Sequence, residues 1–194
     1  MARGGIMQAR NIPLAAALAT LVLAAAPARA HEQACDFLTG GGFIVRDSGA
    51  KANFGVGGGC KHGEPTWGHL QYIDHGTGLN AHWTSITGYF LHGDSEGTDP
   101  KTGQPTGTRL ICGTARTNQF GDVDFVVLAK DVGEPGRDDE FIIRLKKLGL
   151  TVYTTEGDPD HTLGGGGPGG GNIQLHKPNP STSGDFGGEC PALF

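Results

Sequence analysis

The stretch Val123-Asp124-Phe125-Val126-Val127-Leu128-Ala129 carries an apolar side chain at every second position, starting from Val123. A period of two is typical of a half-buried β-strand, because successive side chains of a strand point to opposite faces. The same period recurs in both directions along the chain. It predicts eight or nine strands in total, which centre on residues 43–45, 52–56, 70–72, 79–83, 110–112, 123–129, 141–145 and 173–175.

Glycine-rich turns separate these segments, and the chain contains 35 glycines. The sequences of 74–78 and 133–139 are typical of hairpin turns, which place consecutive strands side by side in antiparallel order. No window after residue 30 has a helical pattern of apolar side chains. We therefore expect an all-β fold, an antiparallel β-sandwich or flattened barrel of eight or nine strands, with little helix outside the signal peptide described next.

The first thirty residues have the pattern of a secretory signal peptide. Arg3 and Arg10 precede the apolar residues 12–26, and Ala28-Arg29-Ala30 has the small-x-small form of a cleavage site. The apolar run is shorter than the ~20 residues that a membrane-spanning helix needs. We expect cleavage after Ala30, no membrane insertion after cleavage, and a secreted or periplasmic protein.

The 164 residues after Ala30 fit one domain by length. We expect a glycine-rich all-β domain over 31–177 and an irregular C-terminal tail over 178–194, which Cys190 can pin to the domain. Loss of the three arginines of the signal leaves 12 basic against 20 acidic residues, a net charge of −8. Such a charge disfavours nucleic acid and anionic lipid. The expected partner is an extracellular ligand or a component of the cell surface.

All four cysteines follow the signal, and an even number in an exported chain predicts two disulfides. Three pairings are possible. We favour Cys60 with Cys112, and Cys35 with Cys190, because the second bond ties the two ends of the mature chain together. A zinc site is the alternative, but no two cysteines have the close spacing of zinc ligands.

Motifs for catalysis are missing from the sequence. No Lys-Ser or Lys-Thr closes any of the glycine runs, so they do not form a phosphate-binding loop. The serines lack the context of a nucleophile elbow, and there is no His-Glu-x-x-His. The sequence nominates no catalytic residue and favours a protein without enzymatic activity, which leaves binding or structural roles.

Histidines provide the alternative hypothesis, an extracellular metalloprotein. Cleavage after Ala30 makes His31 the first residue, and its amine and imidazole, joined by another histidine, would form the copper site of a lytic polysaccharide monooxygenase. His69 and His82 lie on either side of the hairpin at 74–78 and are candidate ligands for zinc or copper. The simpler interpretation is that these histidines are ordinary surface residues, with no cofactor bound.

Two acidic clusters are candidates for calcium, since carboxylate oxygens are its ligands outside the cell. Neither has the spacing of an EF-hand, and solvated loops explain both. The clusters are Asp94, Glu96 and Asp99, and Glu156, Asp158 and Asp160.

Aromatic side chains are the usual anchors of binding patches. Trp67, Tyr72 and Trp83 lie on the middle strands and are the candidate binding residues. The alternative is that both tryptophans belong to the core.

Several motifs follow one another in fixed order over about residues 35–177: Cys35-Asp36-Phe37-Leu38-Thr39-Gly40-Gly41-Gly42-Phe43-Ile44 with Ala52-Asn53-Phe54-Gly55, then Gly68-His69-Leu70-Gln71-Tyr72-Ile73-Asp74, Gly121-Asp122-Val123-Asp124-Phe125, Asp139-Glu140-Phe141-Ile142-Ile143-Arg144-Leu145 and Gly170-Gly171-Asn172-Ile173-Gln174-Leu175-His176. Together they resemble the post-COAP domain family. This family occurs in exported and surface-displayed bacterial proteins, and it has no assigned catalytic residues. The resemblance implies an extracellular β-rich module, although four cysteines and the absence of other modules set this chain apart from many members.

Overall fold

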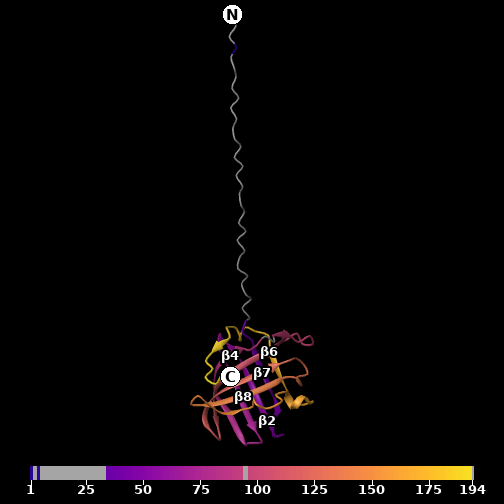
Figure 1. The fold of residues 1–194 in the computed structure, drawn as a ribbon, viewed down its shortest axis with the longest axis vertical. Coiled ribbons are helices and arrows are strands. Elements are labelled where there is room, and N and C mark those ends of the chain that lie inside the picture. The colour runs from indigo at the N-terminus through magenta and orange to yellow at the C-terminus, as the bar shows by residue number, and fades with distance from the viewer. Residues whose placement is uncertain (2–3, 5–33, 94–95, 194) are drawn as a thin grey trace. The chain divides into compact units, whose positions relative to one another are not determined.

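The computed structural model of the chain describes residues 1, 4, 34–93 and 96–193 (Figure 1). The chain divides into two units, 1–32 and 33–194, and every named strand belongs to the second. Apart from Met1 and Gly4, the expected signal peptide lies outside the described residues, as does His31.

Strands dominate the second unit, as the alternating pattern predicts, and the described residues contain no α-helix. One 3-10 helix, η1 (Leu163–Gly166), is the single helical element among them. The strands are β1 (Phe37–Val45), β2 (Lys51–Lys61), β3 (Glu64–Asp74), β4 (Leu79–Leu91), β5 (Gly97–Thr98), β6 (Pro105–Thr117), β7 (Gly121–Asp131), β8 (Glu140–Lys147), β9 (Leu150–Thr154), β10 (Gly171–His176) and β11 (Gly187–Gly188).

Nine of these strands form one curled antiparallel sheet, a half-barrel, in the order β10-β1-β2-β3-β4-β6-β7-β8-β9. The short strands β5 and β11 pair with β6 and β4. The predicted hairpin turns are confirmed, since 74–78 joins β3 to β4 and 133–139 joins β7 to β8. The all-β prediction is therefore confirmed.

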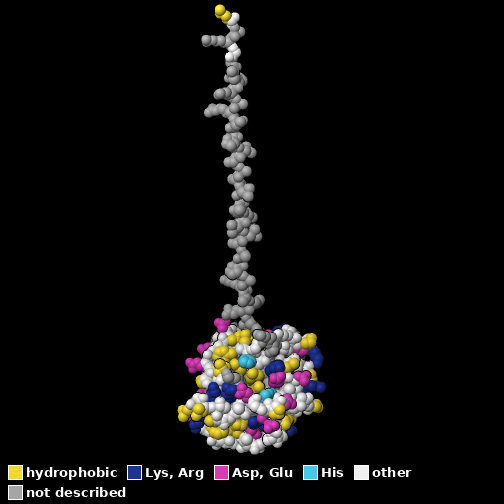
Figure 2. Space-filling view, in the orientation of Figure 1, with side chains coloured by type: hydrophobic (Ala, Val, Ile, Leu, Met, Phe, Trp, Pro, Cys, Tyr) yellow, Lys and Arg dark blue, Asp and Glu magenta, His cyan; other side chains and the backbone are white. Residues whose placement is uncertain are grey.

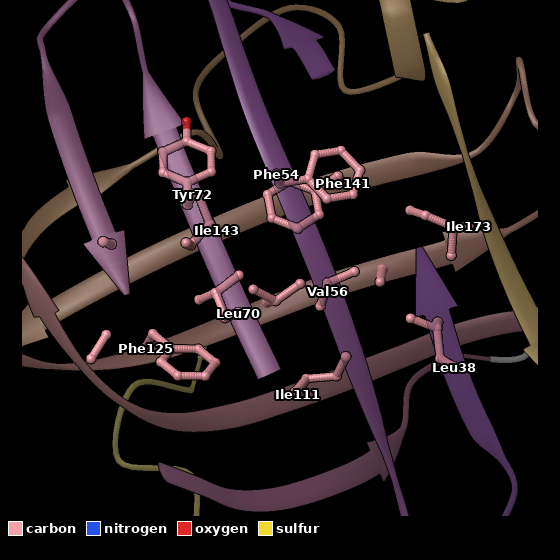
Figure 3. Close-up of a cluster of buried hydrophobic side chains, with 14 of the residues drawn as sticks. Leu38, Phe54, Val56, Leu70, Tyr72, Ile111, Phe125, Phe141, Ile143 and Ile173 are labelled. Carbon is pink, nitrogen blue, oxygen red and sulfur yellow. The ribbon is translucent and has the colours of Figure 1, made fainter. Parts of the chain in front are cut away.

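Side chains from the two walls of the curled sheet fill its interior (Figure 3). Phe54 on β2 stacks on Phe141 on β8 with 3.9 Å between ring centroids, although these strands are far apart in the sheet order. Each fully buried large apolar side chain contributes roughly 1.5–3 kcal/mol to folding. The interior is thus a packed core, to which Leu38, Val56, Leu70, Ile111, Phe125, Ile143 and Ile173 also belong.

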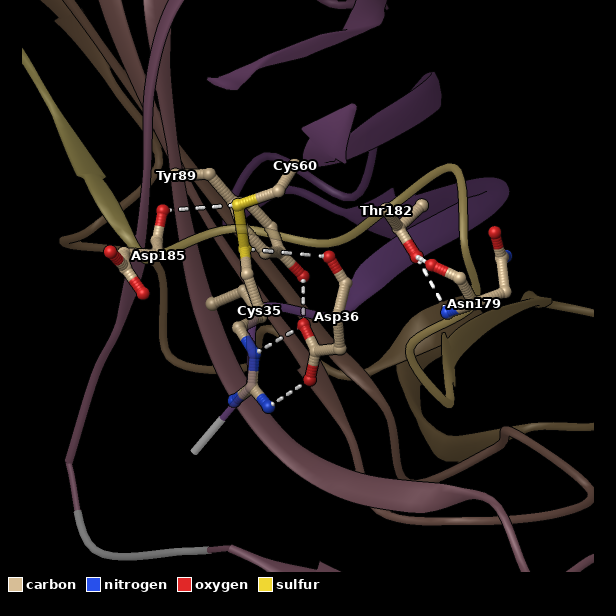
Figure 4. The surroundings of a disulfide bond; sticks show 8 residues. Cys35, Asp36, Cys60, Tyr89, Asn179, Thr182 and Asp185 are labelled. Carbon is tan, nitrogen blue, oxygen red and sulfur yellow. Dashed lines mark hydrogen bonds and ion pairs between the residues drawn. A yellow bond between two sulfur atoms is a disulfide. The ribbon is translucent and has the colours of Figure 1, made fainter. Parts of the chain in front are cut away.

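A buried ion pair lies at one end of the core (Figure 4). The fully buried Arg109 donates hydrogen bonds to both carboxylate oxygens of Asp36, at 3.1 and 2.5 Å, and also pairs with Glu96. The hydroxyl of Tyr89 donates to the same carboxylate at 2.8 Å. Burial, followed by the negative charge of Asp36, raises the pKa of Tyr89 well above its ordinary value. The buried pair joins β6 to Asp36, the residue directly before β1, in the interior of the fold.

The two disulfides join Cys35 to Cys60 and Cys112 to Cys190, with Cα–Cα distances of 5.9 and 5.2 Å. Two bonds were expected and both form, but the favoured pairing, Cys60–Cys112 and Cys35–Cys190, is wrong. Cys60 lies on the core side of β2, whereas Cys112 lies on the outer side of β6, where the tail returns over the sheet. Side chains on opposite faces of a sheet cannot meet.

The C-terminal tail is mostly irregular, as expected, and Cys190 pins it. β11 pairs with β4, and beyond it Ala192 packs with Leu110 and Val126 on the outer side of β6 and β7. Two disulfides indicate an oxidising compartment outside the cytoplasm. Among the described residues, no helix has the length and apolar character needed to cross a membrane.

Candidate binding face

The outward positions of β10, β1, β2 and β3 form one continuous surface, which we call the uncharged face. Its residues stand in cross-strand rows, because the four strands pair in register. The rows are His176-Phe37-Gly59-Trp67, Gln174-Thr39-Gly57-His69, Asn172-Gly41-Gly55-Gln71 and, on three strands, Phe43-Asn53-Ile73.

Glycines occupy three of the four outward positions of β2 in these rows. Two of these glycines are closely covered, since a Cβ added at Gly59 would meet the Phe37 Cβ at 2.5 Å, and one added at Gly57 would meet the His69 ring at 3.0 Å. By contrast, a Cβ added at Gly55 would meet no heavy atom within 4 Å. The middle of the face therefore exposes backbone that no side chain covers at Gly55.

Aromatic rings form the first row. Phe37 stacks on the His176 imidazole with 4.4 Å between centroids and meets the Trp67 ring edge to face at 5.9 Å. His176 Nε2 lies 2.8 Å from the Thr39 hydroxyl, which fixes the imidazole. Burial lowers the pKa of His176 below its ordinary value, with a smaller opposing effect of the Asp36 charge. His176 is thus held neutral near pH 7.

The polar row extends beyond β3 onto β4 and β6. Gln71 lies opposite His82, and His82 lies opposite Arg116. Gln71 Oε1 accepts from His82 Nδ1 at 2.6 Å, and Gln71 Nε2 donates to Asn80 Oδ1 at 2.7 Å. These bonds hold His82 beside a shallow hollow of about 410 Å³, which Asn80, Thr84, Arg116, Thr117 and Asn118 also line.

None of the fifteen outward positions in the four rows is Asp, Glu, Lys or Arg. Charges stand at the borders, where Lys51 lies over the Phe43 ring and Glu134 accepts from Asn172. Charged side chains are instead interspersed over the part of the surface seen in Figure 2. On β7 and β8, for example, six outward positions are charged and three, Val126, Leu128 and Ile142, are apolar; the charged ones are Asp122, Asp124, Lys130, Glu140, Arg144 and Lys146.

The structure separates the three aromatic residues expected to form a binding patch. Trp67 lies on the uncharged face, half-buried. Tyr72 does not lie at the surface, because it points into the core and is 0% exposed. Trp83 is half-buried and packs against the core from β4. Phe37 and His176 were missed as partners of Trp67, since only the register of β10 against β1 brings them together.

His69 and His82 lie on the same outer surface but are offset, since Gln71 is the residue opposite His82. No three His, Cys, Asp or Glu side chains of the described part are grouped so that they could hold a metal ion. In the clusters considered for calcium, four carboxylates are engaged by the protein itself: Glu96 with Arg109, Asp99 with Thr102, Asp158 with Arg46, and Asp160 with Thr162. Glu156 pairs with Arg144, and Asp94 lies outside the described residues.

Comparisons with protein-family models, with curated proteins and with solved structures give no match for this chain.

Proposed function

We propose that this protein is a secreted or periplasmic β-rich module that binds a ligand at or outside the cell surface and performs no chemistry of its own. The uncharged face is its binding surface. The likeness of the strand motifs to the post-COAP domain supports this role, since that family occurs in exported and surface-displayed proteins.

The observation that carries the proposal is that this face has no charged side chain in its four rows, whereas charged side chains stand on other strands of the sheet. An uncharged surface with half-buried aromatic rings loses little solvation free energy when a ligand covers it. Its polar side chains are also held in place before binding, since Gln71 fixes His82 and Thr39 fixes His176. Side chains fixed in advance lose little conformational entropy on binding.

The test measures binding of the purified exported protein to cell-envelope fractions from a bacterial host, by sedimentation. We expect Trp67→Ala to weaken binding at least tenfold while leaving the circular dichroism spectrum unchanged. Leu150→Ala is the matched control, because Leu150 is 73% exposed on β9 and lies outside the face. Equal binding by both variants and the parent would overturn the proposal.

A further inference from the structure

We infer that the ligand of the uncharged face is a neutral polysaccharide, with its chain running across the strands from β10 towards β4. This inference rests on the binding role proposed above and names the class of ligand.

Charge selects among the possible ligands. Nucleic acids and anionic polysaccharides need Lys or Arg to neutralise them, and anionic membranes need basic residues beside apolar ones. The four rows of the uncharged face contain no Lys or Arg. A polymer without charge therefore fits the face best.

The hydrogen-bonding groups of the face suit hydroxyls. Gln71 and Gln174 carry amides, which both donate and accept, and His69 and Thr39 add an imidazole and a hydroxyl. Sugar hydroxyls also donate and accept, so each can pair with any of these groups. Gln174, Thr39 and His69 lie on different strands of one row, and Gln71 lies on the next row, so the contacts are spread over several sugar units.

The aromatic row supplies the apolar contact. A sugar ring has an apolar face of C–H groups, which packs on the flat side of an aromatic ring. Trp67 meets Phe37 edge to face at 5.9 Å, so Phe37 holds the indole in one orientation. Trp67 also borders a shallow hollow of about 350 Å³, which His62, Thr66 and one residue of each charge, Lys61 and Glu64, also line.

The glycines allow close approach. At Gly41 and Gly55, no side chain separates the ligand from the backbone, and Gly55 has open space above it. Neighbouring strands lie about 4.8 Å apart, close to the length of one sugar unit in an extended chain. A chain crossing the strands thus meets a new strand with each unit: bare backbone at Gly41 and Gly55, then the side chains of Gln71 and His82.

Gly55→Leu provides a sharp variant, because it fills the space above the strand while the fold tolerates it. The backbone at Gly55 is not left-handed, and the new Cβ meets nothing within 4 Å. Gly157→Leu is the matched control, since Gly157 is equally open but lies on the loop after β9.

The experiment compares the parent, Trp67→Ala, Gly55→Leu and Gly157→Leu by sedimentation with three samples of one envelope fraction: untreated, periodate-oxidised and protease-treated. Cellulose, chitin and starch are added as pure neutral probes. We expect binding to survive protease, to fall at least tenfold after periodate, which cleaves sugar diols, and to fall equally in Trp67→Ala and Gly55→Leu. Gly157→Leu should bind as the parent does.

The two proposals fail differently in this experiment. Binding that depends on Trp67 and Gly55 but survives periodate and is lost after protease would overturn the polysaccharide and keep the binding role, with a protein as ligand. Binding that none of the variants changes would overturn both. Binding to an acidic polysaccharide that is stronger than to any neutral probe would also overturn the inference.

Discussion

The carboxylate of Asp139 accepts a hydrogen bond from the backbone N–H of Ile173 at 2.8 Å. Ile173 belongs to β10, an edge strand of the curled sheet, and Asp139 directly precedes β8. Asp131, at the end of β7, accepts from Leu175 of the same edge strand at 2.7 Å. Two buried carboxylates thus satisfy N–H groups that an edge strand otherwise leaves open to pairing with another chain.

Replacing Asp139 by Ala should therefore lower the free energy of unfolding by about 2–4 kcal/mol. The substitution leaves the buried N–H of Ile173 without an acceptor, at about 1–3 kcal/mol, and removes the hydrogen bond of the more exposed Val132 N–H, at about 1 kcal/mol. Asp138→Ala is the control, because Asp138 is exposed. Urea unfolding of the two variants measures the difference, and equal stabilities would show that this carboxylate does not hold the edge.

Stability should also depend on pH through Asp139. Burial raises its pKa to about 6, and the charges of Asp131 and Glu134 add to the rise. The folded protein then binds a proton that the unfolded chain releases near pH 4. Protonated Asp139 therefore adds to the free energy of unfolding below about pH 4, and this contribution is lost as the pH rises through 6. Its size is about 1.4 kcal/mol for each unit by which folding raises the pKa. Asp139→Asn should flatten the profile between pH 4 and 7, and parallel profiles of parent and variant would contradict this.

The alternating pattern predicted the strands well, because one side of each strand packs against a single core. Val123, Phe125 and Val127 all face that core, as their spacing implies. The same spacing also separates Trp67 from Tyr72. The two residues are five positions apart and so point to opposite faces, which argues against a shared patch.

The disulfide pairing could not be predicted from the sequence, because the pairing depends on which face of the sheet each cysteine occupies. Leu110, Ile111 and Cys112 are all apolar, so the pattern does not reveal which of them faces outward. The tail covers the outer side of β6, and that second apolar layer buries Leu110 and Cys112 as fully as the core buries Ile111. The aromatic row likewise depends on the pairing of β10 with β1, which are distant in sequence.

Removing Cys112–Cys190 should lower the stability more than removing Cys35–Cys60, and it alone should release the C-terminal tail. The loops closed by Cys112–Cys190 and Cys35–Cys60 span 78 and 25 residues. The chain-entropy model gives about 4.5 and about 3.5 kcal/mol for these lengths. The double variant Cys112→Ser with Cys190→Ser should also release the tail and increase binding of a hydrophobic dye, because Leu110 and Val126 lose their cover.

Urea unfolding and dye fluorescence compare the two double-serine variants with the parent. Peptide mapping without reduction checks the bonds themselves, and a peptide that links Cys60 to Cys112 would contradict the pairing. Dye binding that rises equally in both variants would show that the tail does not depend on its own disulfide.

Export should yield a chain that begins at His31 and is four hydrogens lighter than the reduced mass, because both disulfides form in the oxidising compartment. Intact mass and metal analysis of the same exported sample measure these properties together. We expect no stoichiometric metal, since the side chains that the structure describes form no group of three ligands. Stoichiometric copper on a chain that starts at His31 would favour the metalloprotein alternative, and His31→Ala should then abolish copper binding while leaving both disulfides intact.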